Sequence, residues 1–160
     1  QPAIERCLEM RLDGVFAFSL TRDEMDLLQR ETQSYGLNIG TVYNTPCAKG
    51  CIQVRTDEDQ SLQLAVEHLA NLGHRRIAML STRPEDALAS WRLGAFERAM
   101  NNCSLETADE LLGFDNWERD MADAEVRKLM STHHAPTAII CHRDSTALTC
   151  MRTLRRLGFC

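Results

Sequence analysis

Residues 54–80, VRTDEDQSLQLAVEHLANLGHRRIAML, predict the end of a strand, an acidic turn, an amphipathic helix and then a buried strand. In the helical part, apolar residues recur at spacings close to three and four, which predicts one buried face made of Leu62, Leu64, Ala65, Leu69 and Leu72. The acidic residues 57–59 suit the positive end of the helix dipole, and Gly73 can adopt the left-handed conformation that ends a helix. The apolar run 77–80 is typical of a strand covered on both faces. This order is half of a parallel α/β unit.

The rest of the chain repeats this alternation of strands and helices. Downstream, strands are predicted at 77–80, 111–114 and 137–141, and they alternate with helices near 91–102, 120–132 and 145–157. Upstream, a helical pattern from Ile4 to Leu12 precedes strand 15–18, a helix ended by Gly36, and strands at 37–43 and 51–54. Such alternation predicts an α/β fold in which helices lie on both faces of parallel sheets.

Composition and charge narrow the functions that this chain can have. Its 160 residues, 44% of them hydrophobic, suffice for the core of an ordinary domain. The net charge of −5 argues against a surface that neutralises phosphates, because nucleic-acid binders carry basic patches. We therefore expect this chain alone to bind DNA poorly. No apolar run approaches the roughly 18 residues of a membrane span, so no membrane association is expected.

The seven cysteines do not form a metal-binding pattern. No CxxC spacing occurs among them, and His133 and His134 have no cysteine or carboxylate at ligand spacing, so no metal is expected. Several cysteines lie in apolar contexts, which favours free thiols and a reducing cytoplasm. The glycine-rich, nucleophile-elbow and zinc-helix motifs of common enzymes are absent from the sequence. Cys141 and His142 make no catalytic dyad, because neighbouring strand residues point to opposite faces. We expect neither catalysis nor a cofactor.

Three motifs together carry a family resemblance. They are the segment 54–80, the run Arg92-Leu93-Gly94-Ala95-Phe96, and the segment 135–159, APTAIICHRDSTALTCMRTLRRLGF. In this order and with these gaps, the chain resembles the lactose-repressor/galactose-repressor (LacI/GalR) family of bacterial transcription factors. The resemblance implies a periplasmic-binding-protein-like effector-binding domain with two lobes. Residues 1–56 would be part of the N-terminal lobe, and residues 57–160 most of the C-terminal lobe. Parts of both lobes and the whole helix-turn-helix DNA-binding domain would then lie outside this chain, so we expect Gln1 to be a cut edge.

Candidate binding residues follow the predicted strands, because ligands of open parallel sheets bind beyond the carboxyl ends of the strands. These positions are Ser19, Asn44, Ser81 to Trp91, Phe114 to Trp117, and His142 to Ser145. The resemblance implies that Arg92 clamps the polar groups of a small effector, although an arginine on a helix surface is the plainer interpretation. It also implies that Trp117 covers one face of the ligand, with simple packing as the alternative. Gln60 and Leu88 fall where some relatives have polar pocket residues.

Arg143 and Asp144 open the last predicted helix. Asp144 is first interpreted as its N-cap, since aspartate is among the preferred capping residues. Arg143 stands where family members more often have a neutral residue that contacts the ligand. If Arg92 and Arg143 both point into the site, two positive charges would favour an anionic effector such as a sugar phosphate or a sugar acid.

The leading interpretation is therefore a sensor without enzymatic activity. It would be the effector-binding and dimerising core of a cytoplasmic repressor, a homodimer that binds a small sugar or sugar derivative. The resemblance implies that ligand binding shifts the population between lobe orientations and so controls DNA binding by the absent domain. Two alternatives remain, a periplasmic-type sugar-binding protein and a small α/β enzyme.

Overall fold

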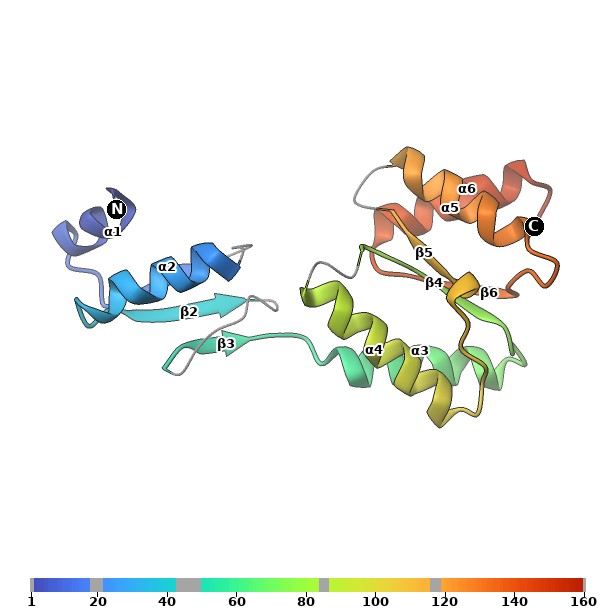
Figure 1. The fold of residues 1–160 in the computed structure, drawn as a ribbon, viewed down its shortest axis with the longest axis horizontal. Helices are drawn as coiled ribbons and strands as arrows, with labels where there is room; N and C mark the ends of the chain where they lie inside the picture. The colour runs from blue at the N-terminus through green and yellow to red at the C-terminus, as the bar shows by residue number, and fades with distance from the viewer. Residues whose placement is uncertain (1, 18–21, 43–49, 84–86, 116–118, 160) are drawn as a thin grey trace. The chain divides into compact units, whose positions relative to one another are not determined.

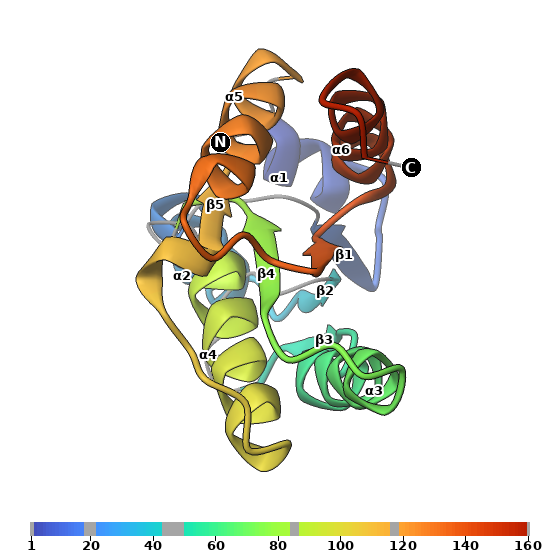
Figure 2. The same cartoon turned by 90° about the vertical axis from the view of Figure 1, so that its right-hand side faces the viewer.

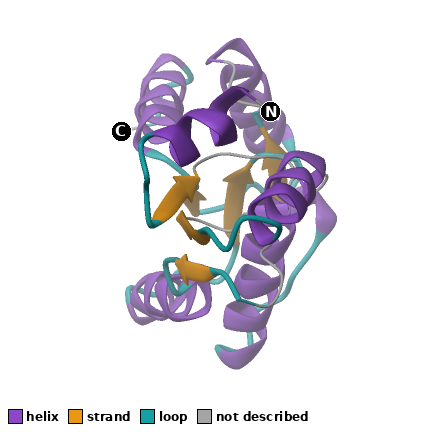
Figure 3. Ribbon diagram, turned by 90° about the vertical axis from the view of Figure 1, so that its left-hand side faces the viewer, coloured by secondary structure: helices purple, strands orange, loops and turns teal. Residues whose placement is uncertain are grey.

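The computed structural model describes residues 2–17, 22–42, 50–83, 87–115 and 119–159 of the chain (Figure 1). These residues form two compact units, Gln1–Thr56 and Asp57–Cys160. Helices and strands alternate in each unit, as the purple and orange segments of Figure 3 show. The α/β class predicted from the sequence is confirmed, and both sheets are parallel throughout.

The first unit contains a three-stranded sheet of order β1-β2-β3. Its elements are α1 (Pro2–Glu9), β1 (Gly14–Ala17), α2 (Arg22–Gln33), β2 (Asn38–Val42) and β3 (Ile52–Val54). Helix α2 packs on β2, and Met25 and Ile39 are among the residues buried there. On the other face, the ring of Phe16 lies over Gly40, where an added Cβ would come within 2.5 Å of a ring carbon. A glycine in this strand therefore allows the close approach of an aromatic ring.

The second unit contains a sheet of order β5-β4-β6. Its elements are α3 (Glu58–Asn71), β4 (Ile77–Ser81), α4 (Ala87–Asn102), a 3-10 turn (Asp109–Leu111), β5 (Leu112–Phe114), α5 (Arg119–Ser131), β6 (Ala138–Cys141) and α6 (Asp144–Arg156). Figures 1 and 2 show α3 and α4 on one side of this sheet and α5 and α6 on the other. The predicted elements are all present, and α4 begins before the predicted residue 91.

The position of β4 in the centre of the sheet explains why residues 77–80 form a continuous apolar run. Ile77 and Met79 belong to the core cluster that they share with α3 and α4. Ala78 and Leu80 belong to a second cluster with residues of α5 and α6. Because successive strand residues point to opposite faces, a strand between two helical layers must be apolar at every position. All five residues of β4 are buried, which confirms the prediction.

Helix α3 begins and ends as predicted, but its buried face is different. Asp57 is the N-cap, and its carboxylate accepts a hydrogen bond of 3.0 Å from the backbone N–H of Gln60. Gly73 follows the helix with φ at +93°. Leu62 and Val66 are the buried apolar residues, whereas Leu64 and Leu72 are 60% and 64% exposed, so their placement in the apolar face was wrong. The helix meets α4 along the face that carries positions 58, 62, 66, 69 and 70.

The cysteines only partly follow the prediction of free thiols. Cys7, Cys103, Cys141 and Cys150 are free. Cys51 is disulfide-bonded, so the prediction is wrong there, because residue spacing alone does not reveal which thiols meet in space. Across the described ranges, no group of three or more histidine, cysteine or acidic side chains is placed to hold a metal ion. Within the same residues, no helix has the length and hydropathy of a membrane span.

Candidate ligand-binding site

Polar residues meet at the carboxyl edge of the second sheet. Ser81 ends β4, Asp115 follows β5, and His142 and Arg143 follow β6. Because the three strands are parallel, their carboxyl ends lie at the same edge. The backbone N–H of Asp115 donates to the carbonyl of Ser81 at 3.0 Å, and that of His142 donates to the carbonyl of Leu80 at 2.9 Å. The sheet pairing thus continues one residue past the strands and holds these side chains in register.

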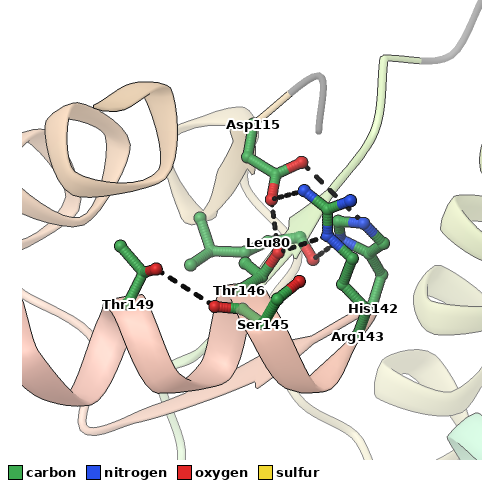
Figure 4. Close-up of polar contacts among 7 residues, drawn as sticks. All are labelled: Leu80, Asp115, His142, Arg143, Ser145, Thr146 and Thr149. Atoms are coloured by element: carbon green, nitrogen blue, oxygen red, sulfur yellow. Dashed lines mark hydrogen bonds and ion pairs between the residues drawn. The ribbon is translucent and has the colours of Figure 1, made fainter. Parts of the chain in front are cut away.

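Asp115 is the centre of this cluster (Figure 4). Its side chain is 0% exposed, and Arg143 Nη2 donates to its Oδ2 at 3.2 Å. The hydroxyl of Thr146, on the first turns of α6, donates to the same oxygen. Arg143 Nε in turn donates to the Thr146 hydroxyl at 3.0 Å, which closes a three-residue ring of polar contacts. A buried carboxylate is tolerated because it has a cationic partner and hydrogen bonds.

His142 lies against the same carboxylate and is held in one orientation. Its side chain is 2% exposed, and its Nε2 lies 3.8 Å from Asp115 Oδ1. Nδ1 lies 3.1 Å from the carbonyl oxygen of Leu80, so Nδ1 carries the proton and donates. Burial lowers the pKa of His142 below its ordinary value, and the negative charge of Asp115 only partly opposes this. The imidazole is therefore neutral at neutral pH.

Arg92 lies on α4 and forms a two-pronged ion pair with Glu58. Its Nε and Nη2 donate to the two carboxylate oxygens at 3.0 and 2.9 Å. The two side chains are only 15% and 11% exposed. Glu58 is the first residue of α3, where the helix dipole favours a carboxylate. Arg92 lies in the second turn of the helix that follows β4, and its positive charge, like that of Arg143, lowers the pKa of His142.

The contacts bear on the expectations about charge and correct the one about capping. Arg92 and Arg143 each pair with a carboxylate, Glu58 and Asp115, whereas the preference for an anionic effector stays a prediction. Asp144 is not the N-cap of α6 but its first helical residue, and it is exposed. Arg143 occupies the N-cap position without a side-chain capping bond, because a guanidinium has no acceptor for the helix N–H groups. It donates to Asp115 and Thr146 instead.

The remaining predicted residues are not brought into this cluster. Gln60 lines a different hollow, a cavity of about 270 Å³ between α3 and α4 whose other lining residues include Asp59, Arg98 and Asn102. Ser19, Asn44 and Trp117 lie outside the described residues. Leu88 is half-buried on the first turn of α4. Of the predicted binding residues, the structure therefore places Arg92 and Arg143 around one edge of the sheet.

Three residues that pair with the predicted arginines were not predicted from the sequence. The sequence indicates Glu58 only as a helix-dipole residue and Thr146 only as part of the last predicted helix. Asp115 lay in the window that follows β5 but was not singled out. A signal existed for Asp115, because an acid that directly follows a buried strand must find a partner. Ser81 was also in the predicted window, and its buried hydroxyl has no hydrogen-bond partner among the described residues.

Residues 66–160 match the model of the family described as periplasmic binding protein-like domain. The chain belongs to this family. The match covers more than half of the chain and includes every residue of the Asp115 cluster. It confirms the prediction of a periplasmic-binding-protein-like fold.

Similar proteins agree with this assignment. The HTH-type transcriptional repressor PurR of Vibrio vulnificus (strain CMCP6) is 28% identical over 159 residues, which cover 97% of this chain and 46% of the repressor. The structure of a LacI-family regulatory protein from Chloroflexus aggregans has a TM-score of 0.85 at 22% identity, over 99% of this chain and 57% of that one. A sugar-binding LacI-family regulator from Escherichia coli, complexed with phosphate, has a TM-score of 0.82 at 23% identity, over 99% and 57% of the two chains.

The predicted resemblance to LacI/GalR regulators is confirmed by these comparisons. The chain spans about half the length of the curated relatives that it matches, 46% in the case of the Vibrio vulnificus repressor.

Proposed function

We propose that this chain is the effector-binding core of a LacI/GalR-type transcriptional regulator. It binds a small sugar-like molecule at the carboxyl edge of the β5-β4-β6 sheet and controls a DNA-binding domain of the same regulator. The observation that carries the proposal is the cluster of buried, oriented polar groups at that edge, in a domain whose relatives are named as repressors. The regulator works in the cytoplasm and without catalysis.

Arg92 is the residue best prepared to hold a ligand. The two bonds to Glu58 use Nε and Nη2 and fix the plane of the guanidinium. An arginine has five N–H donors in a rigid fork, so donors beyond those two bonds remain to serve a ligand. A pre-oriented donor loses little conformational entropy on binding, which is how a small polar ligand gains affinity. The effector then acts by favouring one of two conformations of the regulator, as far as its affinities for them differ.

The test is a thermal-shift measurement on the 160-residue chain with a panel of sugars and sugar derivatives. A binding member raises Tm of the wild type, and Arg92→Ala and Arg92→Lys each lose that ligand-induced rise, because lysine keeps the charge but not the fork. Arg98→Ala is the matched control, since Arg98 also lies on α4 and pairs with an acid of α3, but in an exposed position. A panel without any stabilising member, or a rise that survives in both Arg92 variants, contradicts the proposal.

We also propose that the regulator is a homodimer in which α6 contributes to a two-fold interface. Leu148 and Met151 lie on this helix and are 54% and 52% exposed, although its opposite face is in the core. Light scattering on the chain measures the assembly. The change of both residues to Asp is expected to convert dimers to monomers, whereas Leu64→Asp on the exposed face of α3 leaves the mass unchanged. A wild type that stays monomeric at high concentration rules the interface out.

A further inference from the structure

We propose that the hollow between α3 and α4 is a second small-molecule site, which takes a zwitterion of the size of an α-amino acid. Its volume is about 270 Å³, and its lining consists of Asp59, Gln60, Gln63, Ala95, Arg98, Ala99 and Asn102. None of these residues belongs to the Arg92–Glu58 pair or to the Asp115 cluster. The site therefore goes beyond the proposed function.

Two neighbouring helices build the hollow. Helices α3 and α4 pack side by side (Figure 1). The lining takes positions 59, 60 and 63 from α3 and positions 95, 98, 99 and 102 from α4, which recur about one helical turn apart. Ala95 and Ala99 are each 1% exposed and form the floor. Such small side chains leave space between the helices and offer an apolar surface to the carbon atoms of a ligand.

An ion pair lies at one end of the lining. Nε and Nη2 of Arg98 both donate to Oδ1 of Asp59, at 2.9 and 2.6 Å. In the described part of the chain, no hydrogen bond uses Nη1 of Arg98 or Oδ2 of Asp59, so both groups can serve a ligand. The two side chains are 56% and 49% exposed, which makes them accessible from solvent.

Side-chain amides line the hollow one turn further along both helices. Nδ2 of Asn102 donates to Oε1 of Gln63 at 2.8 Å, and Nε2 of Gln63 donates to Glu67 at 2.7 Å. These bonds hold the two amides in fixed orientations across the helix pair. Gln60 adds a third amide to the lining. Because an amide both donates and accepts, these groups suit a polar ligand of either charge or of none.

The charges of the lining favour a ligand that carries both signs. A simple anion at Arg98 would lie beside the carboxylate of Asp59, and a simple cation at Asp59 would lie beside the guanidinium of Arg98. A zwitterion gives each side chain a partner of opposite charge. Opening the existing pair for the ligand costs little, because water and salt screen an exposed ion pair.

The size of the hollow favours a small metabolite. Its volume of about 270 Å³ is below the roughly 300–1,000 Å³ of pockets that hold drug-sized ligands. An α-amino acid carries its carboxylate and its ammonium group on the same carbon atom, as the neighbouring side chains of Arg98 and Asp59 require. A side-chain amide in the ligand would also meet the amides of Gln63 and Asn102, so L-glutamine is the probe of choice.

The experiment is a thermal-shift measurement on the 160-residue chain with L-glutamine and two matched compounds at equal ionic strength. Glutaramate lacks the ammonium group, and 4-aminobutanamide lacks the carboxylate. L-Glutamine is expected to raise Tm of the wild type on the order of 3 °C at ten times its Kd, and the matched compounds much less. Equal shifts with the three compounds, or no rise with L-glutamine, overturn the proposal.

Three variants show whether the rise comes from the hollow. Arg98→Ala should lose the rise with L-glutamine. Asp59→Asn should no longer distinguish L-glutamine from glutaramate, because the acid that disfavours an anion is removed. Arg127→Ala is the matched control and keeps the wild-type response, since Arg127 forms a comparable ion pair on α5, outside the hollow. A rise that survives in both Arg98→Ala and Asp59→Asn is a general solute effect and overturns the site.

The same variants separate this site from the strand-edge site. Arg98→Ala should keep the response to sugars and lose the response to L-glutamine, whereas Arg92→Ala should do the reverse. If L-glutamine stabilises Arg98→Ala but not Arg92→Ala, the amino acid binds at the strand edge, and the second site is overturned. A failure of all sugars to stabilise the chain would leave the L-glutamine comparison decisive for the hollow.

Discussion

Arg92 and Arg98 show how burial decides what an ion pair contributes. Both lie on α4 and pair with neighbouring acids of α3, Glu58 and Asp59. The side chains of the first pair are 15% and 11% exposed, and those of the second 56% and 49%. Removing one partner of a buried pair leaves an uncompensated charge in a medium of low dielectric constant, whereas water solvates the survivor of an exposed pair.

We therefore predict different stability losses for two neighbouring substitutions. Glu58→Ala should lower the free energy of unfolding by about 3 kcal/mol, and Asp59→Ala by less than about 1 kcal/mol. Urea denaturation of both variants measures the difference. Equal losses would mean that water reaches the Arg92 pair, and would contradict the assignment of a shielded, charge-compensated arginine.

His142 should make the stability of the chain depend on pH. Burial lowers its pKa in the folded state below the ordinary value, so the unfolded chain binds the proton more readily. The neutral imidazole thus stabilises the fold above the unfolded pKa of about 6.5, and that stability is lost as pH falls below it. The free energy of unfolding is expected to drop between pH 7 and pH 6, and less so in His142→Asn. An identical pH profile for the variant would refute the role of His142.

At the scale of elements, α3 shows the limit of periodicity. Leu62 and Leu64 are both leucines in the same helix, but they are 6% and 60% exposed. The sequence pattern predicts that both leucines lie on the apolar face, because a wide apolar stripe accommodates either position. Packing against α4 determines which face is buried, and that face carries Glu58, Leu62 and Val66.

This choice can be tested with two leucine truncations. Leu62→Ala should cost about 2–4 kcal/mol, because it removes packed atoms from the core shared with β4 and α4. Leu64→Ala should change stability by no more than about 0.5 kcal/mol, as for most surface substitutions. Chemical denaturation of both variants provides the comparison. A larger loss from Leu64→Ala than from Leu62→Ala would restore the face predicted from the sequence.

At the scale of the whole molecule, the two units differ in how well their sheets are covered. Every residue of β4 is buried between two helical layers. Every residue of β3 is exposed, and Phe16, Ile52 and Val54 are large apolar residues exposed on the first sheet. Backbone hydrogen bonds beneath packed layers open only with the unfolding of the core, whereas those of a bare strand open locally.

Hydrogen exchange should therefore distinguish the sheets. We expect the amides of β4 to exchange most slowly in the chain and those of β3 to exchange much faster, as measured by mass spectrometry on proteolytic peptides. Comparable protection of the two strands would show that the first sheet is covered in solution, and would contradict this expectation.

The sequence by itself determined the order and type of the elements, because helical periodicity, Gly73 and the apolar run 77–80 act over short stretches of chain. It also determined the family, since the motifs follow one another in a fixed order. Only the tertiary structure decided which charged side chains form ion pairs. Arg92 pairs with Glu58, 34 residues away in the sequence, and Arg143 pairs with Asp115, 28 residues away. Such partners depend on how helices and strands pack, so an arginine that looks like an anion-binding residue in the sequence is a compensated charge in the fold.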